Sequence, residues 1–372
     1  MVDLKRELEP LEAYESPPRW EEITKRVPRA ALEPPPRTPR MRRIAIVIFA
    51  FLVSGTTWAL LLPEGQHPTG TVPTGPVNGP IVVSVLDSTE GGYSTAHLEL
   101  VSPDGSWSRP ITPPDSGVDE YPDASADGRF IAYVHYDDPA TKLQELRVLD
   151  LVSGETVTLT TGEILAPAWS PDGSEIAFLT LKEANAVWSI PAGGGEVRLL
   201  VEGRTEELQR RPLWGSPSWS PDGSAMTFEV GPAPGGGDDA SSGVVSFDLT
   251  TRALTFLAAT NGNVGGHPAW SPDGERIAYA VMGGIWTVPS TGGEPSLIAG
   301  VSTQTASAPS YDHDLQPRQP VWSPDGTALT FVRTIRDRDS VWLDGLDGSE
   351  WTHVSAGSDA DWLAENDSVE GE

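Results

Sequence analysis

The sequence predicts an all-β fold: a six-bladed β-propeller with four-stranded blades, preceded by a single transmembrane helix. Three observations predict it. A phrase of the form P-x-W-S-P-D-G recurs along the chain, the repeats are spaced by about 50 residues, and one long uncharged apolar stretch lies before the first repeat. Repetition at this spacing is typical of propeller blades.

The repeated phrase occurs in four near-identical copies and one degenerate copy. The four tryptophans, Trp169, Trp219, Trp270 and Trp322, are separated by 50, 51 and 52 residues. The degenerate copy, YPDASADGRFIAY, carries Ala124 in place of the tryptophan, 45 residues before the first of them. Each period is therefore expected to form one blade.

Each repeat divides into four short strands, for example 166–170, 175–181, 186–191 and 196–201, with glycine-rich turns between them. The S-P-D-G segment suits a turn, because proline presets φ, aspartate bonds back to the backbone and glycine accepts a positive φ. We therefore expect this segment to be structural.

The strand count predicts how the ring closes. Five full blades run from about Tyr121 to Ser355, and strand-like segments remain at both ends. Segments 81–87, 97–104 and 106–112 supply three strands of a sixth blade, and the segment around Trp362 completes it as the inner strand. A blade shared between the two ends would leave no open edge in the ring.

The repeated phrase P-x-W-S-P-D-G-x-x-[IAL]-x-[FY] resembles the WD-like propeller repeat of the TolB family, over about residues 81–365. The resemblance implies an extracytoplasmic platform that binds protein without catalysis. Related repeats also form the substrate-gating domains of prolyl oligopeptidase-type enzymes. The segment before the repeats differs from the α/β domain that precedes the TolB propeller, so the partners of TolB are not transferred to this chain.

The apolar stretch predicts a membrane anchor. Residues 44–62 are 19 residues without a charge, and a helix of that length spans roughly 28 Å of a hydrocarbon core about 30 Å thick. Arg37, Arg40, Arg42 and Arg43 precede it, so the N-terminus is expected in the cytoplasm and the propeller outside the cell membrane. A cleavable signal peptide is the alternative, but its charged region would exceed 40 residues and no clear cleavage site follows.

The predicted domains follow from these segments. Residues 1–43 form a cytoplasmic basic and amphipathic tail, 44–62 the transmembrane helix, 63–80 a Pro/Gly-rich linker, 81–366 the propeller and 367–372 an acidic tail. Residues 18–27 have the pattern of a short amphipathic helix. This segment is either a docking helix for a cytoplasmic partner or part of a disordered or membrane-associated tail.

Charge and composition exclude several classes of function. The net charge is −28; residues 1–43 carry 10 basic and 8 acidic residues (+2), which leaves 15 and 45 (−30) for the remainder. Such an acidic chain without a basic stripe excludes nucleic-acid binding. Because there is no cysteine, disulfides, thiolate zinc sites, thiol catalysis and a cysteine lipid anchor are also excluded.

Catalytic motifs are not found. The chain has no G-x-S-x-G nucleophile elbow, no H-E-x-x-H zinc motif and no phosphate-binding loop, so no catalytic residue, cofactor or metal is predicted. The recurring tryptophans are expected to pack between blades. The aspartates of the S-P-D-G turns have a sufficient role in the turn, which disfavours calcium sites.

Partner binding is predicted on the loops opposite the S-P-D-G turns, because loops on a rigid scaffold commonly bind ligands. The candidates are Asp137, Asp138, Arg210, Arg211, Asp238, Asp239, Tyr311, Asp312, His313, Asp314, Arg336 and Arg338. The predicted function is non-enzymatic recognition of a protein, peptide or cell-envelope component. The alternatives are a transmembrane regulator similar to anti-sigma factors, a propeller enzyme such as a lactonase, and a purely structural scaffold.

Overall fold

The computed structural model describes residues 77–88, 95–114, 117–137, 143–180, 185–206, 208–232, 242–260, 267–281, 284–300, 318–335, 338–346 and 350–366. The chain divides into two compact units, Met1–Pro73 and Thr74–Glu372. The predicted tail, transmembrane helix at 44–62 and most of the linker lie outside the described residues. Within the described ranges there is no helix that is long and apolar enough to cross a membrane.

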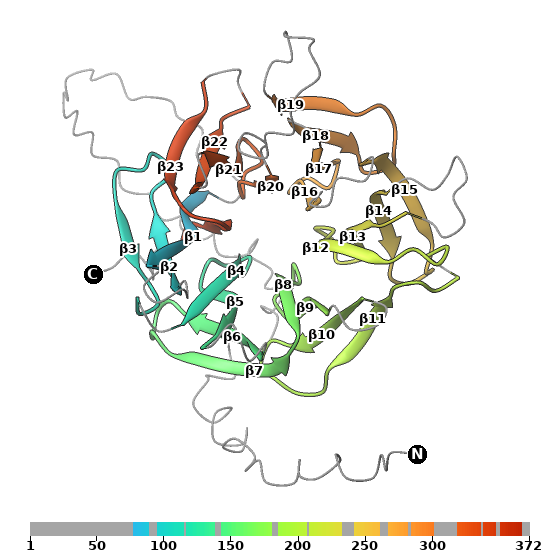
Figure 1. The fold of residues 1–372 in the computed structure, drawn as a ribbon. Coiled ribbons are helices and arrows are strands. Elements are labelled where there is room, and N and C mark those ends of the chain that lie inside the picture. Colours follow the sequence, from blue (N-terminus) through green and yellow to red (C-terminus); the bar gives the residue numbers. More distant parts are fainter. Residues whose placement is uncertain are drawn as a thin grey trace, which may run out of the picture. The chain divides into compact units, whose positions relative to one another are not determined.

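Every regular element in the described part of the chain is a β-strand (Figure 1). Four sheets have four strands each, in the order of the chain. The first sheet contains β8 (Ile164–Trp169), β9 (Glu175–Thr180), β10 (Ala186–Pro191) and β11 (Arg198–Glu202), and the second contains β12 (Leu213–Trp219), β13 (Ala225–Val230), β14 (Gly243–Asp248) and β15 (Leu254–Ala259). The third contains β16 (Ala269–Trp270), β17 (Arg276–Val281), β18 (Gly284–Pro289) and β19 (Ser296–Gly300). The fourth contains β20 (Arg318–Trp322), β21 (Leu329–Ile335), β22 (Arg338–Asp344) and β23 (Thr352–Ala356).

The remaining strands form one eight-stranded sheet in the order β24-β1-β2-β4-β5-β6-β7, with β3 paired to β2. Their bounds are β1 (Asn78–Ser88), β2 (Thr95–Val101), β3 (Ser108–Pro110), β4 (Val118–Ala124), β5 (Phe130–Tyr136), β6 (Gln144–Asp150), β7 (Thr156–Gly162) and β24 (Ala360–Ala364). Among the described residues, backbone pairing between the two halves of this sheet is limited to the pair Ala96↔Val118, between β2 and β4.

The sheets surround a common axis, with the first strand of each repeat innermost and the fourth at the rim (Figure 1). The inner strands contact one another in the order β24, β4, β8, β12, β16, β20 and back to β24. The predicted all-β propeller fold is confirmed.

In each repeat, the first and second strands pair in the same register. The same sequence phrase can therefore specify the start of every sheet. Trp169 pairs with Ile176, Trp219 with Met226, and Trp270 with Ile277. The strand that follows is buried on both faces, as Ile176 to Leu179 are, because each sheet is covered by a neighbour on either side. Its apolar run therefore lacks the alternation of a half-exposed strand.

The S-P-D-G turns have the predicted chemistry. In the first complete turn, the Ser170 hydroxyl donates to Asp172 Oδ1 at 2.7 Å and the Ser174 N–H donates to the same oxygen at 3.0 Å. Gly173 has a φ of 68°, a left-handed conformation that glycine adopts readily. These hydrogen bonds also hold the pKa of Asp172 below its ordinary value.

The first and last described strands meet as predicted. Strand β24 pairs antiparallel with β1, with Ile81 opposite Trp362 and Val82 opposite Asp361. Two boundaries differ from the sequence prediction: β1 begins at Asn78, inside the expected linker, and β3 spans only Ser108–Pro110 of the expected 106–112. The shorter β3 arises because Ser106 and Trp107 bond back into the 102–105 turn, at Asp104 Oδ1 and Ser102 Oγ.

Candidate functional site: the central pocket

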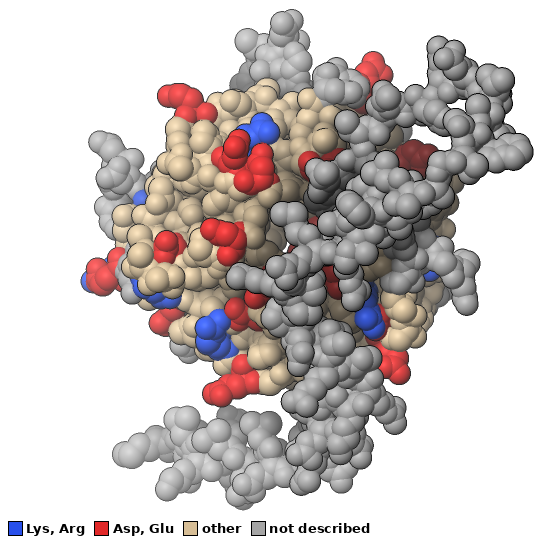
Figure 2. Space-filling view, turned by 180° about the vertical axis from the view of Figure 1, so that it is seen from behind, with Lys and Arg blue, Asp and Glu red and all other residues tan. Residues whose placement is uncertain are grey.

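A pocket of about 410 Å³ lies on the axis of the ring. Its walls are the inner strands together with the turns that follow them, so that equivalent residues of every repeat line it. The volume falls in the range of about 300–1,000 Å³ usual for ligand pockets. Figure 2 shows more acidic than basic residues on the visible face of the described part of the chain.

One of two hydrogen bonds ties Trp219, Trp270 and Trp322 to the inner strand before each of them. At Trp219 and Trp322 the indole N–H donates to the backbone carbonyl of Ala168 or Ala269 on the previous strand, at 3.1 Å in both cases. At Trp270 the backbone N–H instead donates to the Ser218 hydroxyl at 3.3 Å. The type of hydrogen bond at these three junctions thus differs with the residue before the previous tryptophan, which is alanine in the first case and serine in the second.

Carboxylates take this connecting role on one side of the pocket. Asp361 Oδ2 accepts the backbone N–H of Ala124 at 2.6 Å, and Asp123 Oδ2 accepts that of Trp169 at 2.6 Å. Burial raises the pKa of Asp123, and the charge of Asp361 raises it further. Burial also raises the pKa of Asp361, against hydrogen bonds from the backbone that lower it.

The ring of tryptophans is interrupted at the same place. Trp362 on β24 and Trp169 on β8 are buried against the pocket, but β4 between them carries Ala124. The two carboxylates of Asp361 and Asp123 stand immediately before these positions in the chain. This side of the pocket, defined by Asp123, Ala124 and Asp361, is called the acidic notch below.

The opposite end of the inner strands carries a second polar group of residues. Gln319 Nε2 donates to Asp359 Oδ1 at 2.7 Å, and Ser216 Oγ lies 2.9 Å from His267 Nδ1. Asp359 is 8% exposed, and its burial raises its pKa. Burial, with a smaller contribution from the charge of Arg318, lowers the pKa of His267 to about 4, so this imidazole is neutral at pH 7.

Several of these residues have left-handed backbone conformations, which are energetically unfavourable for residues other than glycine. Tyr121, Ala166, His267 and Gln319 each precede the proline of a repeat and have φ values of 54°, 47°, 34° and 53°. A left-handed conformation costs a non-glycine residue about 1–2 kcal/mol. The inner strands therefore hold the entrance side chains in an orientation that an isolated strand would not adopt.

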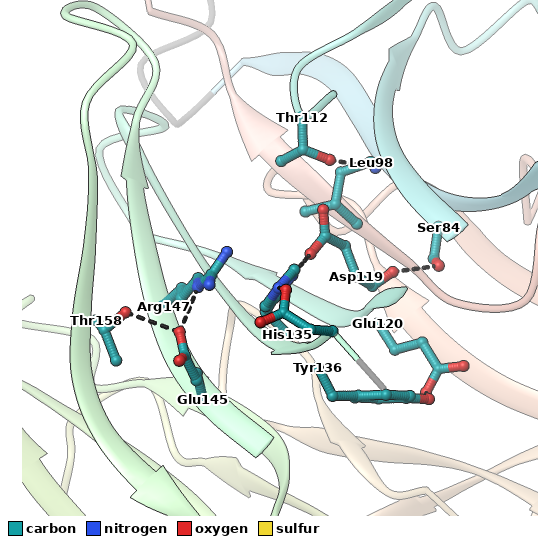
Figure 3. A network of polar contacts seen from close by, with 11 residues as sticks. Ser84, Leu98, Thr112, Asp119, Glu120, His135, Tyr136, Glu145, Arg147 and Thr158 are labelled. Atoms are coloured by element: carbon teal, nitrogen blue, oxygen red, sulfur yellow. Dashed lines mark hydrogen bonds and ion pairs between the residues drawn. The ribbon is translucent and has the colours of Figure 1, made fainter. Parts of the chain in front are cut away.

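A buried polar network lies beside this end of the pocket, in the β4–β7 half of the eight-stranded sheet (Figure 3). His135 is 2% exposed; its Nδ1 lies 2.6 Å from Asp119 Oδ1 and its Nε2 lies 2.8 Å from Asp137 Oδ1. The Tyr136 hydroxyl donates to Glu120 Oε2 at 2.7 Å. Both ring nitrogens of His135 face carboxylates, so the imidazole lacks the free nitrogen that a general base requires.

A second cavity lies at the rim between the β16–β19 and β20–β23 sheets, with a volume of about 1,030 Å³. Trp342 and Trp351 line it, and the guanidinium of Arg333 lies over both rings, 5.4 and 5.2 Å from their centroids. Trp351 also donates to the buried Asp344 at 3.0 Å. These aromatic side chains are engaged in packing within their own sheet.

Of the loop residues predicted from sequence, the described part of the chain contains Asp137, Arg210, Arg211 and Arg338. Asp137 is 82% exposed and bonds to His135; Arg210 pairs with Glu206 at 2.5 Å and is also exposed. Arg211 is 3% exposed, bonds to the carbonyl of Gly231 at 3.3 Å and lies over Phe256, so it packs inside the domain. Arg338 is exposed on β22. The other candidates lie outside the described residues: Asp138, Asp238, Asp239, Tyr311, Asp312, His313, Asp314 and Arg336.

The sequence prediction did not include Asp123 and Asp361. A signal for them was present, because the residue before the tryptophan is Ala168, Ser218, Ala269 or Val321 in the near-identical copies and a carboxylate only at these two positions. In the ranges that the structure describes, no group of three or more histidine and acidic side chains is arranged to hold a metal ion.

Comparison with known proteins adds information on the fold. No protein-family model matches the chain, and no curated protein matches it. TolB from Acinetobacter baumannii is similar over 77% of this chain and 67% of its own, at 17% identity and a TM-score of 0.60. A TolB candidate from Agrobacterium tumefaciens (77% and 97%, 19% identity, TM-score 0.52) and a chain of a nidogen/laminin complex (77% and 100%, 10% identity, TM-score 0.56) are also similar. These similarities support the TolB-type propeller fold.

Proposed function

We propose that this chain is a non-enzymatic, membrane-anchored binding protein whose propeller lies outside the cell membrane and recognises a protein, peptide or cell-envelope component. The observation that carries the proposal is the central pocket, which combines a ligand-sized volume, unpaired polar groups and a neutral imidazole. The similarity to TolB propellers is consistent with a binding role.

The proposed architecture has six four-stranded blades. The eight-stranded sheet supplies two of them, β24-β1-β2-β3 and β4-β5-β6-β7, because its halves are joined by a single residue pair. The remaining four blades are the separate four-stranded sheets. The membrane anchor at 44–62 and the cytoplasmic position of the tail rest on the apolar run and the arginines before it.

The central pocket is preferred to the exposed loops as the binding site. Its polar groups are held rigidly by the ring, whereas Arg211 of the predicted loop set is buried and Arg210 is paired with Glu206. The loop residues remain a prediction for contacts outside the pocket. An enzyme is disfavoured because both ring nitrogens of His135 face carboxylates, which leaves this imidazole without a free nitrogen for general-base chemistry.

Capture of partners from native membranes tests this function. The full chain is crosslinked and purified beside the variant Ala124→Trp, which introduces the bulky side chain found in the other repeats and fills the acidic notch. Glu275→Gln, an exposed change away from the pocket, is the control. We expect Ala124→Trp to lose partners that the wild type and control retain; identical partner sets for all three proteins would contradict a role of the pocket.

The same experiment on a chain lacking residues 1–40 addresses the alternative of a transmembrane regulator. Loss of cytoplasmic partners with the tail would support signalling through the N-terminal segment. An unchanged set of extracytoplasmic partners would leave the tail as an anchor.

A further inference from the structure

We infer that the last described strand, β24 (Ala360–Ala364), is a pH-dependent latch, which closes the ring at acidic pH and detaches locally as the pH rises. The inference goes beyond the proposed function, because detachment is a property of the protein alone. It rests on three features of the described residues: the contacts that hold β24, the carboxyl groups that this strand carries, and the charges that face those groups.

Strand β24 is held differently on its two sides. On one side its backbone pairs with β1, where Asp361 lies opposite Val82 and Ala360 lies opposite Val83. Toward β4 the described residues form no backbone pairs with it, and a side chain makes the connection: Asp361 Oδ2 accepts the Ala124 N–H at 2.6 Å. In the sheets of the described chain β24 pairs only with β1, so it can leave without breaking any other strand pair.

The latch carries two carboxyl groups inside the ring. Asp359 is 8% exposed and accepts a hydrogen bond from Gln319 Nε2 at 2.7 Å. Asp361 lines the central pocket and is partly exposed there, and its hydrogen bonds come from the backbone N–H groups of Ala124 and Trp362. No ion pair joins Asp361 to a basic side chain among the described residues. Ionisation of a carboxyl group that has lost water and has no basic partner is energetically unfavourable.

The charges that face these two carboxyl groups are mostly negative. Asp361 faces Asp123 on β4, whose own pKa is raised by burial and further by the charge of Asp361. The titratable groups around Asp359 are Arg318, Asp339, Glu120, Tyr121 and Tyr136. The cation among them, Arg318, is already bonded to Asp339 Oδ2 at 2.6 Å. Ionisation of Asp361 together with Asp123 therefore places two like charges on β24 and β4, which repel each other.

These surroundings set the direction of the pH effect. Burial raises the pKa of Asp361 to about 7 and also raises the pKa of Asp359. When β24 detaches, both carboxyl groups enter water, where the pKa of an aspartate is about 3.9. The attached strand therefore keeps protons that the detached strand releases between about pH 4 and pH 7. Attachment of β24 is strongest below about pH 4 and weakens as the pH rises through this interval.

Detachment changes the central pocket, because Ala360, Asp361 and Trp362 form part of its wall. It also exposes the edge of β1, where Ile81 and Val82 are 0% exposed in the closed ring. The latch therefore makes the shape of the pocket depend on the pH of the surroundings.

Amide hydrogen exchange of the full chain in detergent micelles tests the latch at pH 5, 6 and 7, with each rate corrected for the pH dependence of exchange in an unstructured peptide. Strands β13 and β14, which belong to a separate sheet, are the internal reference. From pH 5 to pH 7 we expect the protection of β24 to fall at least about tenfold more than that of the reference. A smaller difference, including a parallel loss of protection in all strands, would overturn the inference.

The double variant Asp123→Asn/Asp361→Asn tests whether these carboxyl groups drive the change. It keeps an oxygen acceptor for each backbone N–H and cannot ionise, so the pH-dependent loss of protection in β24 should shrink at least about fivefold. The control Asp344→Asn changes a carboxyl group that is 7% exposed on β22 and should behave as the wild type. An undiminished loss in the double variant would overturn the role of the pair. The comparison of strands uses the wild-type protein, so it remains decisive if the variant fails to fold.

Discussion

At four junctions, the residue just before the repeat tryptophan, or before Ala124 in the degenerate copy, correlates with how the next inner strand is joined. Where that residue is alanine, as at Ala168 and Ala269, the next tryptophan binds through its indole N–H. Where it is Asp123 or Ser218, the next strand binds through its backbone N–H, and the indole is left unpaired. The correlation covers these four positions and does not extend to Trp362, whose indole N–H is also unpaired although Val321 precedes the tryptophan of the strand before it.

This arrangement predicts different effects for two substitutions of Asp361. Asp361→Ala removes the acceptor of the Ala124 N–H and should lower the free energy of unfolding by about 1–3 kcal/mol, because a buried donor is left without a partner. Asp361→Asn keeps an acceptor in the same place and should lower the free energy of unfolding by a smaller amount. Urea unfolding of both variants checks this; an equal loss in the two would show that the charge matters more than the hydrogen bond.

His135 predicts a dependence of stability on pH. Burial alone would lower its pKa, but hydrogen bonds to Asp119 and Asp137 outweigh burial and raise it, even with Arg147 nearby. A histidine with a raised folded-state pKa contributes stability that is fully present below its unfolded pKa of about 6.5 and is lost as the pH rises through the folded value. We expect unfolding free energy to fall from pH 6 to pH 8.

The variant His135→Gln separates this contribution from others. It should flatten the pH dependence over that interval, as measured by urea unfolding at pH 5.5, 7 and 8.5. Asp361 acts in the same direction, because an acid with a raised folded-state pKa also loses stability as the pH rises. A pH dependence in His135→Gln that is identical to the wild type would contradict the assigned role of the imidazole.

At the scale of the elements, the local chemistry of turns and strands was readable from the sequence. Strand β10, Ala186–Pro191, has the predicted bounds, and the S-P-D-G turn has the predicted hydrogen bonds. The 102–105 segment adopts the same turn between β2 and β3, with Gly105 at a φ of 68°. The turn is therefore specified by four residues and does not depend on its place in a repeat.

The acidic notch was not predicted, for a physical reason. Asp361 and Ala124 are separated by 237 residues and meet only because the C-terminal strand closes the ring beside β4. Neither carboxylate belongs to a local motif, and each fits a solvent-exposed strand when its own segment is considered alone. The buried network of Asp119, His135 and Asp137 was missed for a related reason: Asp119 and His135 lie on two strands whose pairing depends on the register, and Asp137 follows the second strand.

Closure of the ring predicts a contrast between two glycines with the same conformation. Gly128 and Gly173 both have a φ of about 68°, at 67° and 68°. A Cβ at Gly173 would meet nothing within 4 Å, whereas at Gly128 it would lie 2.2 Å from the carbonyl oxygen of Ala364 on β24. Gly173→Ala should lower the free energy of unfolding by about 1–2 kcal/mol, because alanine is strained in this left-handed conformation. Gly128→Ala should lower it further, because β24 must also move to make room for the Cβ.

Hydrogen exchange identifies where that extra cost falls. In Gly128→Ala the amides of β24 and β1 should exchange faster than in the wild type, while Gly173→Ala should leave them protected. Unchanged protection of β24 in Gly128→Ala would mean that the C-terminal strand does not close the ring through this contact.

At the scale of the whole molecule, the acidity of the chain predicts how partners associate. The net charge of the chain is −28. If the partner carries a cationic segment, its association rate should fall as ionic strength rises, because salt screens the long-range attraction. Surface plasmon resonance between 50 and 500 mM NaCl measures this effect. A rate that does not depend on salt would argue against a cationic partner.

The central claim is that partners bind at the axis of the propeller. A photocrosslinking amino acid placed at Ala126, an exposed residue that lines the pocket, tests it in native membranes beside the same probe at Leu199, which is 43% exposed on the outer strand β11. The account predicts crosslinked partners from position 126 and none specific to position 199. Crosslinks from position 199 alone would contradict it and would place binding at the rim.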